Sequence, residues 1–236
     1  MSFFGHHKLP NKIAIVTGGD NGIGRAVAIA LAEEGADILI VYLNEHIDAH
    51  FTQTQILAKG RRCEMIAGDI GKEAFCKKVI DYALNVFGKI DILVNNTGFE
   101  EPQDQRYKTF HTNVYGMIFL CRAAMPYLQK GCSIINTSSV TFLKKGKQLL
   151  DYAATKGAII SFTRSLAKNL AHSGIRVNAI APGPIWNERQ SLFMKGLLRP
   201  SHHALCFVFL ASDEASYITG QVLHLKGGEI VKKESL

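Results

Sequence analysis

The sequence predicts a single α/β domain in which one doubly wound parallel sheet carries helices on both faces. Two observations predict this fold. Short apolar runs rich in β-branched residues alternate with amphipathic helical patterns along the chain, an order typical of parallel sheets with helical crossovers. The 236 residues also suit one such domain, because no repeat, low-complexity tract or linker divides them.

The first predicted strand and helix enclose a glycine-rich turn. Residues 12–16 (KIAIV) form an apolar strand, and the helical pattern of residues 26–34 ends at Gly35, which acts as a C-cap. The turn between them includes the sequence TGGDNGIG. Small residues let the backbone approach a ligand, and the helix dipole favours an anion such as a pyrophosphate. A tight turn needs glycine in any case, but the flanking strand and helix favour a phosphate site.

The remaining elements continue the alternation. The predicted strands span residues 38–43, 63–67, 91–94, 133–137, 175–180 and 222–225, and the predicted helices span residues 49–59, 75–87, 107–128 and 202–210, with a further helix around Tyr152. Right-handed crossovers place the carboxyl ends of parallel strands along one edge of the sheet. Asp69, Asn95, Gly98 and Ser139 all follow predicted strands. We therefore expect them to line one ligand crevice.

Tyr152 and Lys156 are the candidate acid/base pair. Their spacing of four residues places both side chains on one face of a helix. An ammonium beside a phenol favours the phenolate and lowers a pKa that is about 10 when unperturbed. Ser138 and Ser139 follow the strand at residues 133–137, where a hydroxyl could bond a substrate oxygen. A lone pair of this kind is common on solvated helix faces, so its meaning depends on the rest of the chain.

Asn113 lies in the middle of the long helix predicted over residues 107–128. Asparagine is a poor helix former, so one hypothesis gives it a polar task such as bonding a backbone carbonyl or a water. The other hypothesis is a side chain that faces solvent. The sequence favours neither.

Composition bounds the environment and the partners. The formal net charge is +7, but no Lys/Arg block has interleaved aromatic residues, so the sequence favours anionic small ligands over nucleic acid. The five cysteines form no C-x-x-C pair, and we expect free thiols in a reducing compartment. With no signal-peptide pattern and no apolar run long enough for a bilayer, we expect a cytoplasmic protein without a membrane association. Residues 1–11 are expected to form a flexible tail whose His6 and His7 bind no metal.

Over nearly its whole length the chain resembles the short-chain dehydrogenase/reductase family. The matching residues are TGGDNGIG from Thr17 to Gly24, Asp69, NNTG from Asn95 to Gly98, Asn113, Ser139, the Tyr-x-x-x-Lys pair at Tyr152 and Lys156, and APGPI from Ala181 to Ile185. Longer stretches such as DYAATKGAIISFTRSLA are similar to a bacterial subgroup of general stress and glucose/ribitol-type dehydrogenases.

This resemblance implies a Rossmann-type fold, an NAD or NADP cofactor, a small alcohol or carbonyl substrate and a homotetramer. It implies that Tyr152 exchanges the proton, Lys156 lowers its pKa and holds the nicotinamide ribose, Ser139 orients the carbonyl and Asn113 anchors a relay water. Asp69 would bond the adenine. The implied cofactor-binding residues are Gly18, Asn21, Gly22, Ile23, Gly24, Tyr42, Asp69, Ile70, Asn95, Thr97, Gly98, Tyr152, Lys156, Pro182, Gly183 and Ile185.

The chain departs from the family in two shortened segments, residues 100–109 and residues 187–203, the second of which corresponds to a helical substrate lid. Asn187 also stands where many members have a threonine that bonds the nicotinamide carboxamide. The leading hypothesis is an NAD(P)-dependent oxidoreductase of a secondary alcohol or ketone. The alternative is a catalytically weak dinucleotide-binding regulatory or scaffold protein that has lost its lid.

The cofactor choice is open, with a lean to NAD. Tyr42, Leu43 and Asn44, at the end of the second predicted strand, offer neither a carboxylate for a 2′-hydroxyl nor a base for a 2′-phosphate. No arginine or lysine lies in the turn before Gly22.

Overall fold

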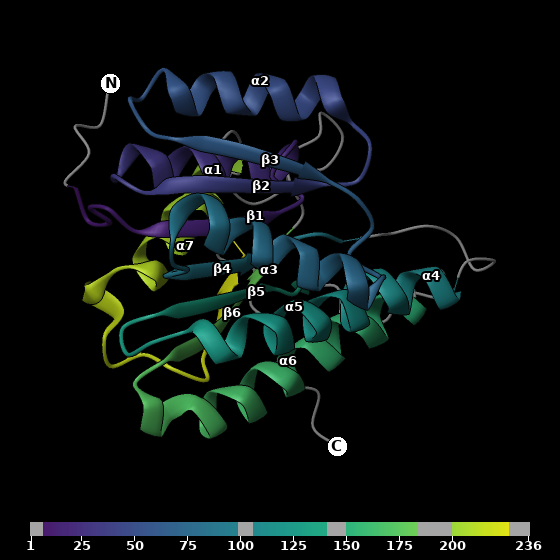
Figure 1. The fold of residues 1–236 in the computed structure, drawn as a ribbon. Helices are drawn as coiled ribbons and strands as arrows, with labels where there is room; N and C mark the ends of the chain where they lie inside the picture. Colours follow the sequence, from purple (N-terminus) through teal and green to yellow (C-terminus); the bar gives the residue numbers. More distant parts are fainter. Residues whose placement is uncertain (1–6, 99–105, 141–149, 184–199, 227–236) are drawn as a thin grey trace.

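A computed structural model describes residues 7–98, 106–140, 150–183 and 200–226 of the chain. Its centre is a seven-stranded sheet in the order β3-β2-β1-β4-β5-β6-β7 (Figure 1). Every neighbouring pair of strands is parallel. The strand order reverses between β1 and β4, and in such sheets ligands bind at that switch point, outside the carboxyl ends of the strands. The predicted doubly wound fold is confirmed.

The strands are β1 (Ile13–Thr17), β2 (Asp37–Tyr42), β3 (Cys63–Ala67), β4 (Ile92–Asn95), β5 (Ser133–Thr137), β6 (Arg176–Pro182) and β7 (Val222–Leu225). The α-helices are α1 (Gly22–Glu33), α2 (His46–Leu57), α3 (Glu73–Phe87), α4 (Arg106–Phe110), α5 (Gly116–Ala124), α6 (Leu150–Leu170) and α7 (Pro200–Ala211). A π-helical turn, η2 (His111–Tyr115), joins α4 to α5, and short 3₁₀ turns follow α5, α6 and α7.

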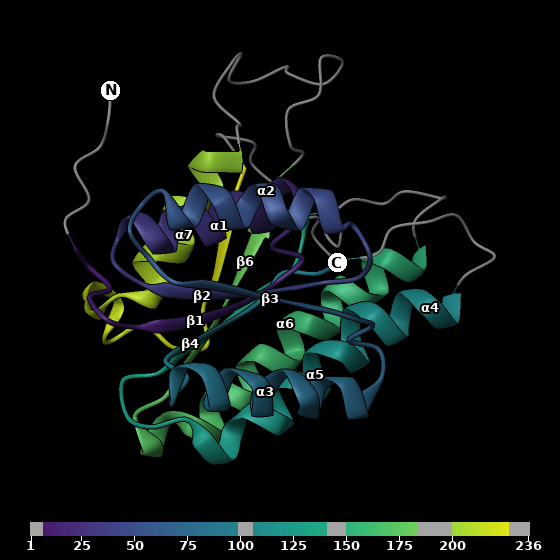
Figure 2. The same cartoon turned by 45° about the horizontal axis from the view of Figure 1, so that its top comes forward.

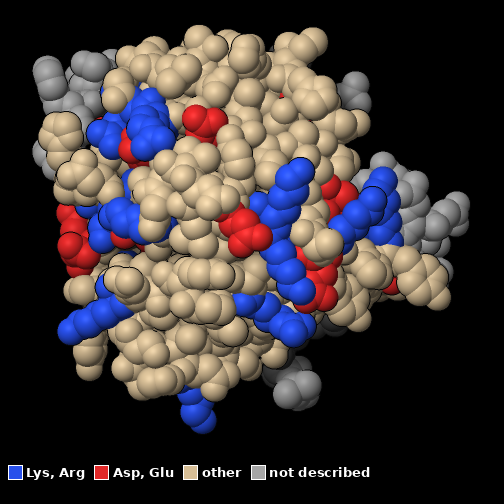
Figure 3. Space-filling view, in the orientation of Figure 1, with Lys and Arg blue, Asp and Glu red and all other residues tan. Residues whose placement is uncertain are grey.

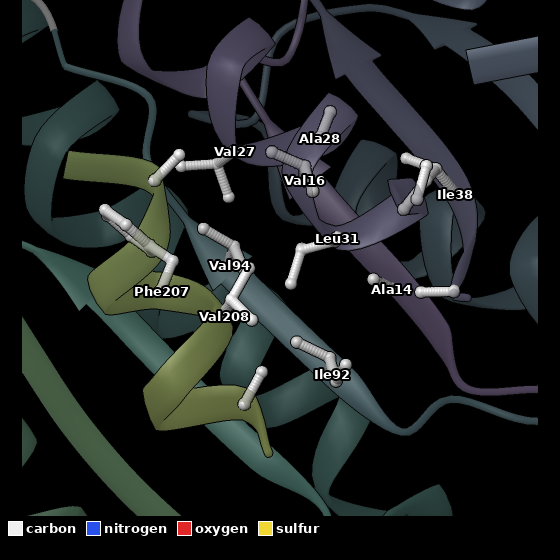
Figure 4. Close-up of a cluster of buried hydrophobic side chains, with 14 of the residues drawn as sticks. Ala14, Val16, Val27, Ala28, Leu31, Ile38, Ile92, Val94, Phe207 and Val208 are labelled. Carbon is white, nitrogen blue, oxygen red and sulfur yellow. The ribbon is translucent and has the colours of Figure 1, made fainter. Parts of the chain in front are cut away.

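Helices cover both faces of the sheet, with α1, α2 and α7 on one side and α3, α5 and α6 on the other (Figure 2). Successive side chains along a strand point to opposite faces of the sheet, so they belong to two separate hydrophobic cores. Val16 and Val94 pack with Val27 of α1 and Phe207 of α7 (Figure 4). Their strand neighbours belong to the second core, under α3, α5 and α6. Strands buried on both faces account for the near-continuous apolar runs in the sequence.

Helix α1 begins four residues earlier than predicted, at Gly22 instead of Ala26. The two glycines Gly22 and Gly24 have little helix propensity, but here they form the first helical turn directly after the loop. The N-terminus of α1 therefore lies within the glycine-rich segment itself.

The helix predicted over residues 107–128 is not continuous. It is interrupted by the π turn η2, which carries Asn113 at its centre, and it ends in a 3₁₀ turn at Met125–Tyr127. A π turn adds one residue to a helical turn and is frequent at functional sites. It changes the direction in which Asn113 projects from the helix.

The prediction of a flexible tail over residues 1–11 is wrong for residues 8–11, which the structure holds in place. Leu9 is fully buried against the α1 core, and its N–H donates to Glu34 O at 2.9 Å. Lys8 forms an ion pair of 2.9 Å with Glu214. Burial of one apolar side chain anchors this segment.

The segment expected as a shortened lid, residues 187–203, overlaps a core helix. Residues 184–199 lie outside the described residues, whereas Pro200 begins α7 and His203 is buried. The last four residues of the expected lid therefore form the first turn of α7, in which His203 is buried and Ser201 and His202 are exposed.

The surface and the cysteines agree with the composition. Lysine and arginine side chains are interspersed with acidic ones on the face seen in Figure 3. All five cysteines are free thiols, as predicted. Burial raises the pKa of Cys121 to about 12, which keeps this thiol protonated and unreactive. Within the part of the chain that the structure describes, no helix is long and apolar enough to cross a bilayer.

Candidate functional site

In the glycine-rich loop between β1 and α1, the backbone at Gly24 packs directly against the backbone at Gly18. Gly18 and Gly22 have positive φ angles of 62° and 55°, which L side chains rarely adopt. A Cβ on Gly24 would lie 1.8 Å from Gly18 O, so no side chain fits there. Gly18 N–H donates to Val41 O at 2.8 Å, which fixes the loop to β2. The result is a concave turn that leads into the N-terminus of a helix.

This turn has the features of an anion site. The first four N–H groups of a helix lack intrahelical partners, and the helix dipole favours negative charge at that end. Asn21, the N-cap of α1, is exposed and makes no side-chain capping hydrogen bond. Ile23 lies in the first turn of the helix. The open backbone and the absence of Cβ atoms fit a pyrophosphate at this position.

Acidic side chains gather beside the loop at the end of β2. Asp20 lies near Glu45 and Asp48; burial raises the pKa of its carboxyl group, and these two carboxylates raise it further. Arg25 donates from Nη2 to Asp48 Oδ1 at 2.6 Å and from Nε to Asp20 O at 2.8 Å. Its charge is thus already paired. Tyr42, at the end of β2, is hydrogen-bonded through its hydroxyl to His46 Nδ1 at 2.9 Å.

The end of β3 turns sharply beside the π turn. Asp69 Oδ1 accepts a hydrogen bond of 2.8 Å from Gly71 N–H, so one carboxylate oxygen shapes the turn. Ile70 is buried and lies against Gly116, where an added Cβ would come within 2.9 Å of Ile70 Cγ1. The Asp69–Ile70 pair thereby joins β3 to the start of α5.

Thr17 ties the end of β4 to the glycine-rich loop. Its buried Oγ1 accepts hydrogen bonds of 3.0 Å from Asn96 N–H and from Thr97 N–H. Asn96 Nδ2 lies 3.4 Å from Gly18 O as a further contact. The sequence alone predicts no role for Thr17, because a threonine at the end of a strand looks like an ordinary strand residue.

Asn95 ends β4 and is buried. Its Nδ2 donates to Asn136 Oδ1 of β5 at 2.9 Å. Its Oδ1 has no hydrogen-bond partner among the described residues. A buried acceptor in this state needs a polar group from a ligand or a water. The predicted role of Asn95 beside a cofactor is consistent with this free acceptor.

Lys156 is a buried cation at the centre of the site. It is only 2% exposed, and its Nζ donates to Thr137 O, the last residue of β5, at 3.1 Å. The same atom lies 5.3 Å from the ring centroid of Tyr152. A Cβ on Gly98 would lie 3.3 Å from Nζ, so the chain after β4 also passes close to the ammonium. The structure therefore brings Tyr152, Lys156 and Gly98 together, as the sequence predicts.

Ser138 and Ser139 continue β5 toward the same ammonium. Ser138 is buried, and its Oγ donates to Lys156 O at 2.9 Å, which fastens α6 to the strand end. Ser139 is partly exposed. Ser139 is therefore the more exposed of the two serines.

Asn113 is 2% exposed, so the hypothesis of a solvent-facing asparagine is wrong. Its Nδ2 donates to Thr155 Oγ1 of α6 at 3.2 Å. Asn113 therefore makes a buried polar contact, as the first hypothesis expects, but this hydrogen bond goes to a side-chain hydroxyl and not to a backbone carbonyl. No part of the sequence pattern singled out Thr155.

A small pocket collects the ends of these elements. Its lining residues are Thr17, Ile70, Asn95, Thr97, Thr112, Asn113, Met117, Thr137 and Ile159. They come from β1, β4, β5, the end of β3 and three helices. Of the residues expected to share one crevice, Asn95 lines this pocket, whereas Asp69, Gly98 and Ser139 are not among its lining residues.

Pro182 and Gly183 lie at the end of β6, and Gly183 N–H donates to Leu225 O at 2.8 Å. Both are buried in the sheet edge, beside the site and not within the pocket lining. Ile185 and Asn187 lie outside the described residues. In the part of the chain that is described, no group of three or more His, Cys, Asp or Glu side chains could hold a metal ion.

Comparison with known proteins matches this geometry to one family. The family described as "Enoyl-(Acyl carrier protein) reductase" matches residues 18–229. General stress protein 39 of Bacillus subtilis (strain 168) is 45% identical over 249 residues, covering 96% of this chain and 87% of that protein. Glucose and ribitol dehydrogenase of Daucus carota is 41% identical over 253 residues, covering 95% and 87% respectively.

Among solved structures, a short chain dehydrogenase from Burkholderia cenocepacia J2315 in complex with NADP is similar, with a TM-score of 0.86 at 30% identity. The match covers 94% of this chain and 98% of that chain. The chain thus shares its fold, over 94% of its residues, with a protein whose structure contains NADP. Its open glycine loop and buried lysine fit a nicotinamide dinucleotide.

Proposed function

The chain belongs to the short-chain dehydrogenase/reductase family and is an NAD(P)-dependent oxidoreductase, and we propose that its substrate is a secondary alcohol or ketone. The observation that supports this proposal most strongly is the buried Lys156 ammonium, hydrogen-bonded to Thr137 O and 5.3 Å from the Tyr152 ring. Burying a cation costs free energy unless the cation is paired or hydrogen-bonded, and a phenol beside it can exchange a proton.

The remaining residues supply binding and orientation. The N-terminus of α1 and the loop at Gly18 and Gly24 would hold the pyrophosphate, and Lys156 would hold the nicotinamide ribose. The bound cofactor supplies the hydride acceptor or donor. Ser139 is a partly exposed residue, and its hydroxyl would donate to the substrate oxygen, where negative charge develops.

In the oxidative direction, the alcohol would lose one hydride and one proton. The C–H bond of the alcohol breaks as its hydride leaves for the cofactor, and the O–H bond breaks as its proton passes to the Tyr152 oxygen. The carbon–oxygen double bond of the ketone forms. In the reductive direction Tyr152 returns the proton to the carbonyl oxygen. Lys156 remains an ammonium throughout and stabilises the phenolate electrostatically.

We further propose a preference for NAD over NADP. The 2′ position of the adenosine ribose is expected beside the end of β2. Burial raises the pKa of the Asp20 carboxyl group, and the charges of Glu45 and Asp48 raise it further. Arg25, the nearest cation, is already bonded to Asp48. A 2′-phosphate would meet this negative charge, whereas a 2′-hydroxyl would not.

A homotetramer is also proposed for this chain. Its support is the exposed apolar surface on neighbouring helices: Tyr107 of α4 is 88% exposed and Leu150 of α6 is 67% exposed. Tyr115 of η2 stacks on Phe119 of α5 with ring centroids 6.0 Å apart, which extends this surface along the helix. Contacts between copies of the chain would remove these side chains from water.

The first test is the Tyr152→Phe variant. We expect it to lose about 100-fold or more in kcat, because the proton-transfer group is removed, while it still binds NADH. Turnover is followed by NADH absorbance over a panel of sugar alcohols, other secondary alcohols and ketones, and binding by NADH fluorescence. Tyr217→Phe is the matched control, since Tyr217 is fully exposed, and it should retain wild-type kcat.

Wild-type protein that binds NADH but turns over no member of the panel would support the alternative, a dinucleotide-binding regulatory or scaffold protein. Equal kcat in the wild type and in Tyr152→Phe would refute the acid/base role.

The second test compares dissociation constants for NADH and NADPH by fluorescence titration. We expect NADH to bind about tenfold more tightly, which corresponds to about 1.4 kcal/mol. Glu45→Gln should narrow the difference by improving NADPH binding. Asp81→Asn, an exposed carboxylate of α3 on the other face of the sheet, should leave the ratio unchanged. Tighter binding of NADPH by the wild type would contradict the proposed preference and would favour Arg25 as a phosphate partner.

The third test is the mass of the protein in solution by light scattering. A mass of four chains is expected, and Tyr107→Asp should shift it toward smaller species because it places a charge in the contact. A wild-type mass of one chain would reject the tetramer.

A further inference from the structure

Two buried threonines of α6 make the same pattern of hydrogen bonds. Thr155 and Thr163 are both fully buried. Thr155 Oγ1 donates to Tyr152 O at 2.7 Å, and Thr163 Oγ1 donates to Ile159 O at 2.7 Å. Each hydroxyl also accepts a bond from a buried asparagine, as described below. A threonine in a helix often bonds the carbonyl three or four residues earlier, as Thr155 and Thr163 respectively do. The difference that bears on the site is the asparagine partner.

Thr163 accepts from Asn136 Nδ2 of β5 at 2.9 Å. That bond fastens the middle of α6 to the sheet. Thr155 accepts from Asn113 Nδ2 at 3.2 Å, and Asn113 belongs to the π turn that lines the pocket. Thr155 therefore connects two parts of the candidate site that belong to different helices.

The chemistry of a hydroxyl makes this connection directional. A threonine has one O–H donor, and here that donor is directed to Tyr152 O. The oxygen is then left to accept from Asn113, which requires the amide nitrogen of Asn113 to face α6. One hydroxyl thus fixes the backbone at Tyr152 and the amide orientation of Asn113 together.

We propose that Thr155 is a positioning residue for the hydride-transfer reaction, acting by setting the place of Tyr152 relative to Asn113. This inference rests on the proposed function. Among the described residues, the Thr155 hydroxyl bonds Asn113 Nδ2 and Tyr152 O, and neither partner belongs to the glycine-rich loop. We therefore expect its loss to affect the chemical step more than dinucleotide binding. A displacement of about 1 Å at a reacting group can cost about 100-fold in rate.

The test is a comparison of Thr155→Val with Thr163→Val. Valine matches threonine in shape and removes the hydroxyl, so both variants lose a buried hydrogen-bond bridge of the same kind. Thr155→Val is expected to lower kcat about 10- to 100-fold and to shift the pH profile of kcat, with the dissociation constant for NADH within twofold of wild type. Thr163→Val is expected to lower Tm by about as much as Thr155→Val does, while its kcat stays within threefold of wild type.

Restoring the hydroxyl should restore the rate. Thr155→Ser is expected to keep kcat within about threefold of wild type, whereas Thr155→Ala is not. This pair also covers the case in which Thr155→Val fails to fold, because serine and alanine leave the same space and differ only in the hydroxyl. In combination with Asn113→Ala, Thr155→Val should lower kcat no further than the more impaired single variant, since both remove the same bond.

Three results would overturn the inference. The first is a kcat of Thr155→Val equal to that of wild type; the second is an equal loss of kcat in Thr155→Val and Thr163→Val, which indicates a general structural effect. The third is Thr155→Ser as slow as Thr155→Ala. Wild-type protein without turnover would be recognised separately in the same assay, and it would refute the proposed function together with this inference.

Discussion

The burial of the Lys156 ammonium is the constraint on which the rest of the site depends. A cation removed from water is strongly destabilising unless hydrogen bonds and aromatic or anionic partners compensate it. Here Thr137 O and the Tyr152 ring provide part of that compensation. The ammonium is thereby held where β4, β5 and α6 converge, at the edge of the sheet that is open to a ligand. The cost of burying it is the physical reason to expect that the site acts on charge.

The supporting polar contacts are arranged around this cation. Ser138 fastens the carbonyl of Lys156 itself, so the lysine is held at its backbone as well as at its head group. Thr17 holds the chain that leads from β4 to Gly98. These hydrogen bonds are 2.9 to 3.0 Å long, and each joins segments that are distant in the chain. The site is therefore built from strand ends and helices, and a rigid frame of this kind suits a reaction that requires exact placement of a proton donor.

The sequence predicted the architecture well because the physical signals were strong. The ranges of β3, β5 and β7 were predicted correctly, since a short run of residues between two turn segments leaves few alternative strand ends. The start of α1 was missed because glycines that serve the loop also form the first helical turn. The π turn was missed because one inserted residue leaves the apolar spacing of the long helix nearly intact. Residues 8–11 were taken for a tail although one leucine is enough to anchor them.

The sequence predicted which residues meet at the candidate site, but it did not predict the residues that hold them in place. Tyr152, Lys156 and Gly98 meet as expected, and Asn113 is buried beside them. Thr155 carries no sequence signal, and Thr17 belongs to a matching motif without a predicted role of its own. A buried threonine that bonds a backbone group looks, in the sequence, the same as a threonine chosen for its shape. Such residues are recognised only when their partners, distant in the chain, are seen in space.

The most direct test of the central claim is a crystal structure of the protein with bound NAD or NADP. The account predicts the pyrophosphate at the N-terminus of α1, Lys156 Nζ within hydrogen-bond distance of the nicotinamide ribose, and the Tyr152 hydroxyl facing the substrate side of the nicotinamide ring. A Tyr152 hydroxyl directed into bulk solvent, remote from the nicotinamide, would contradict it.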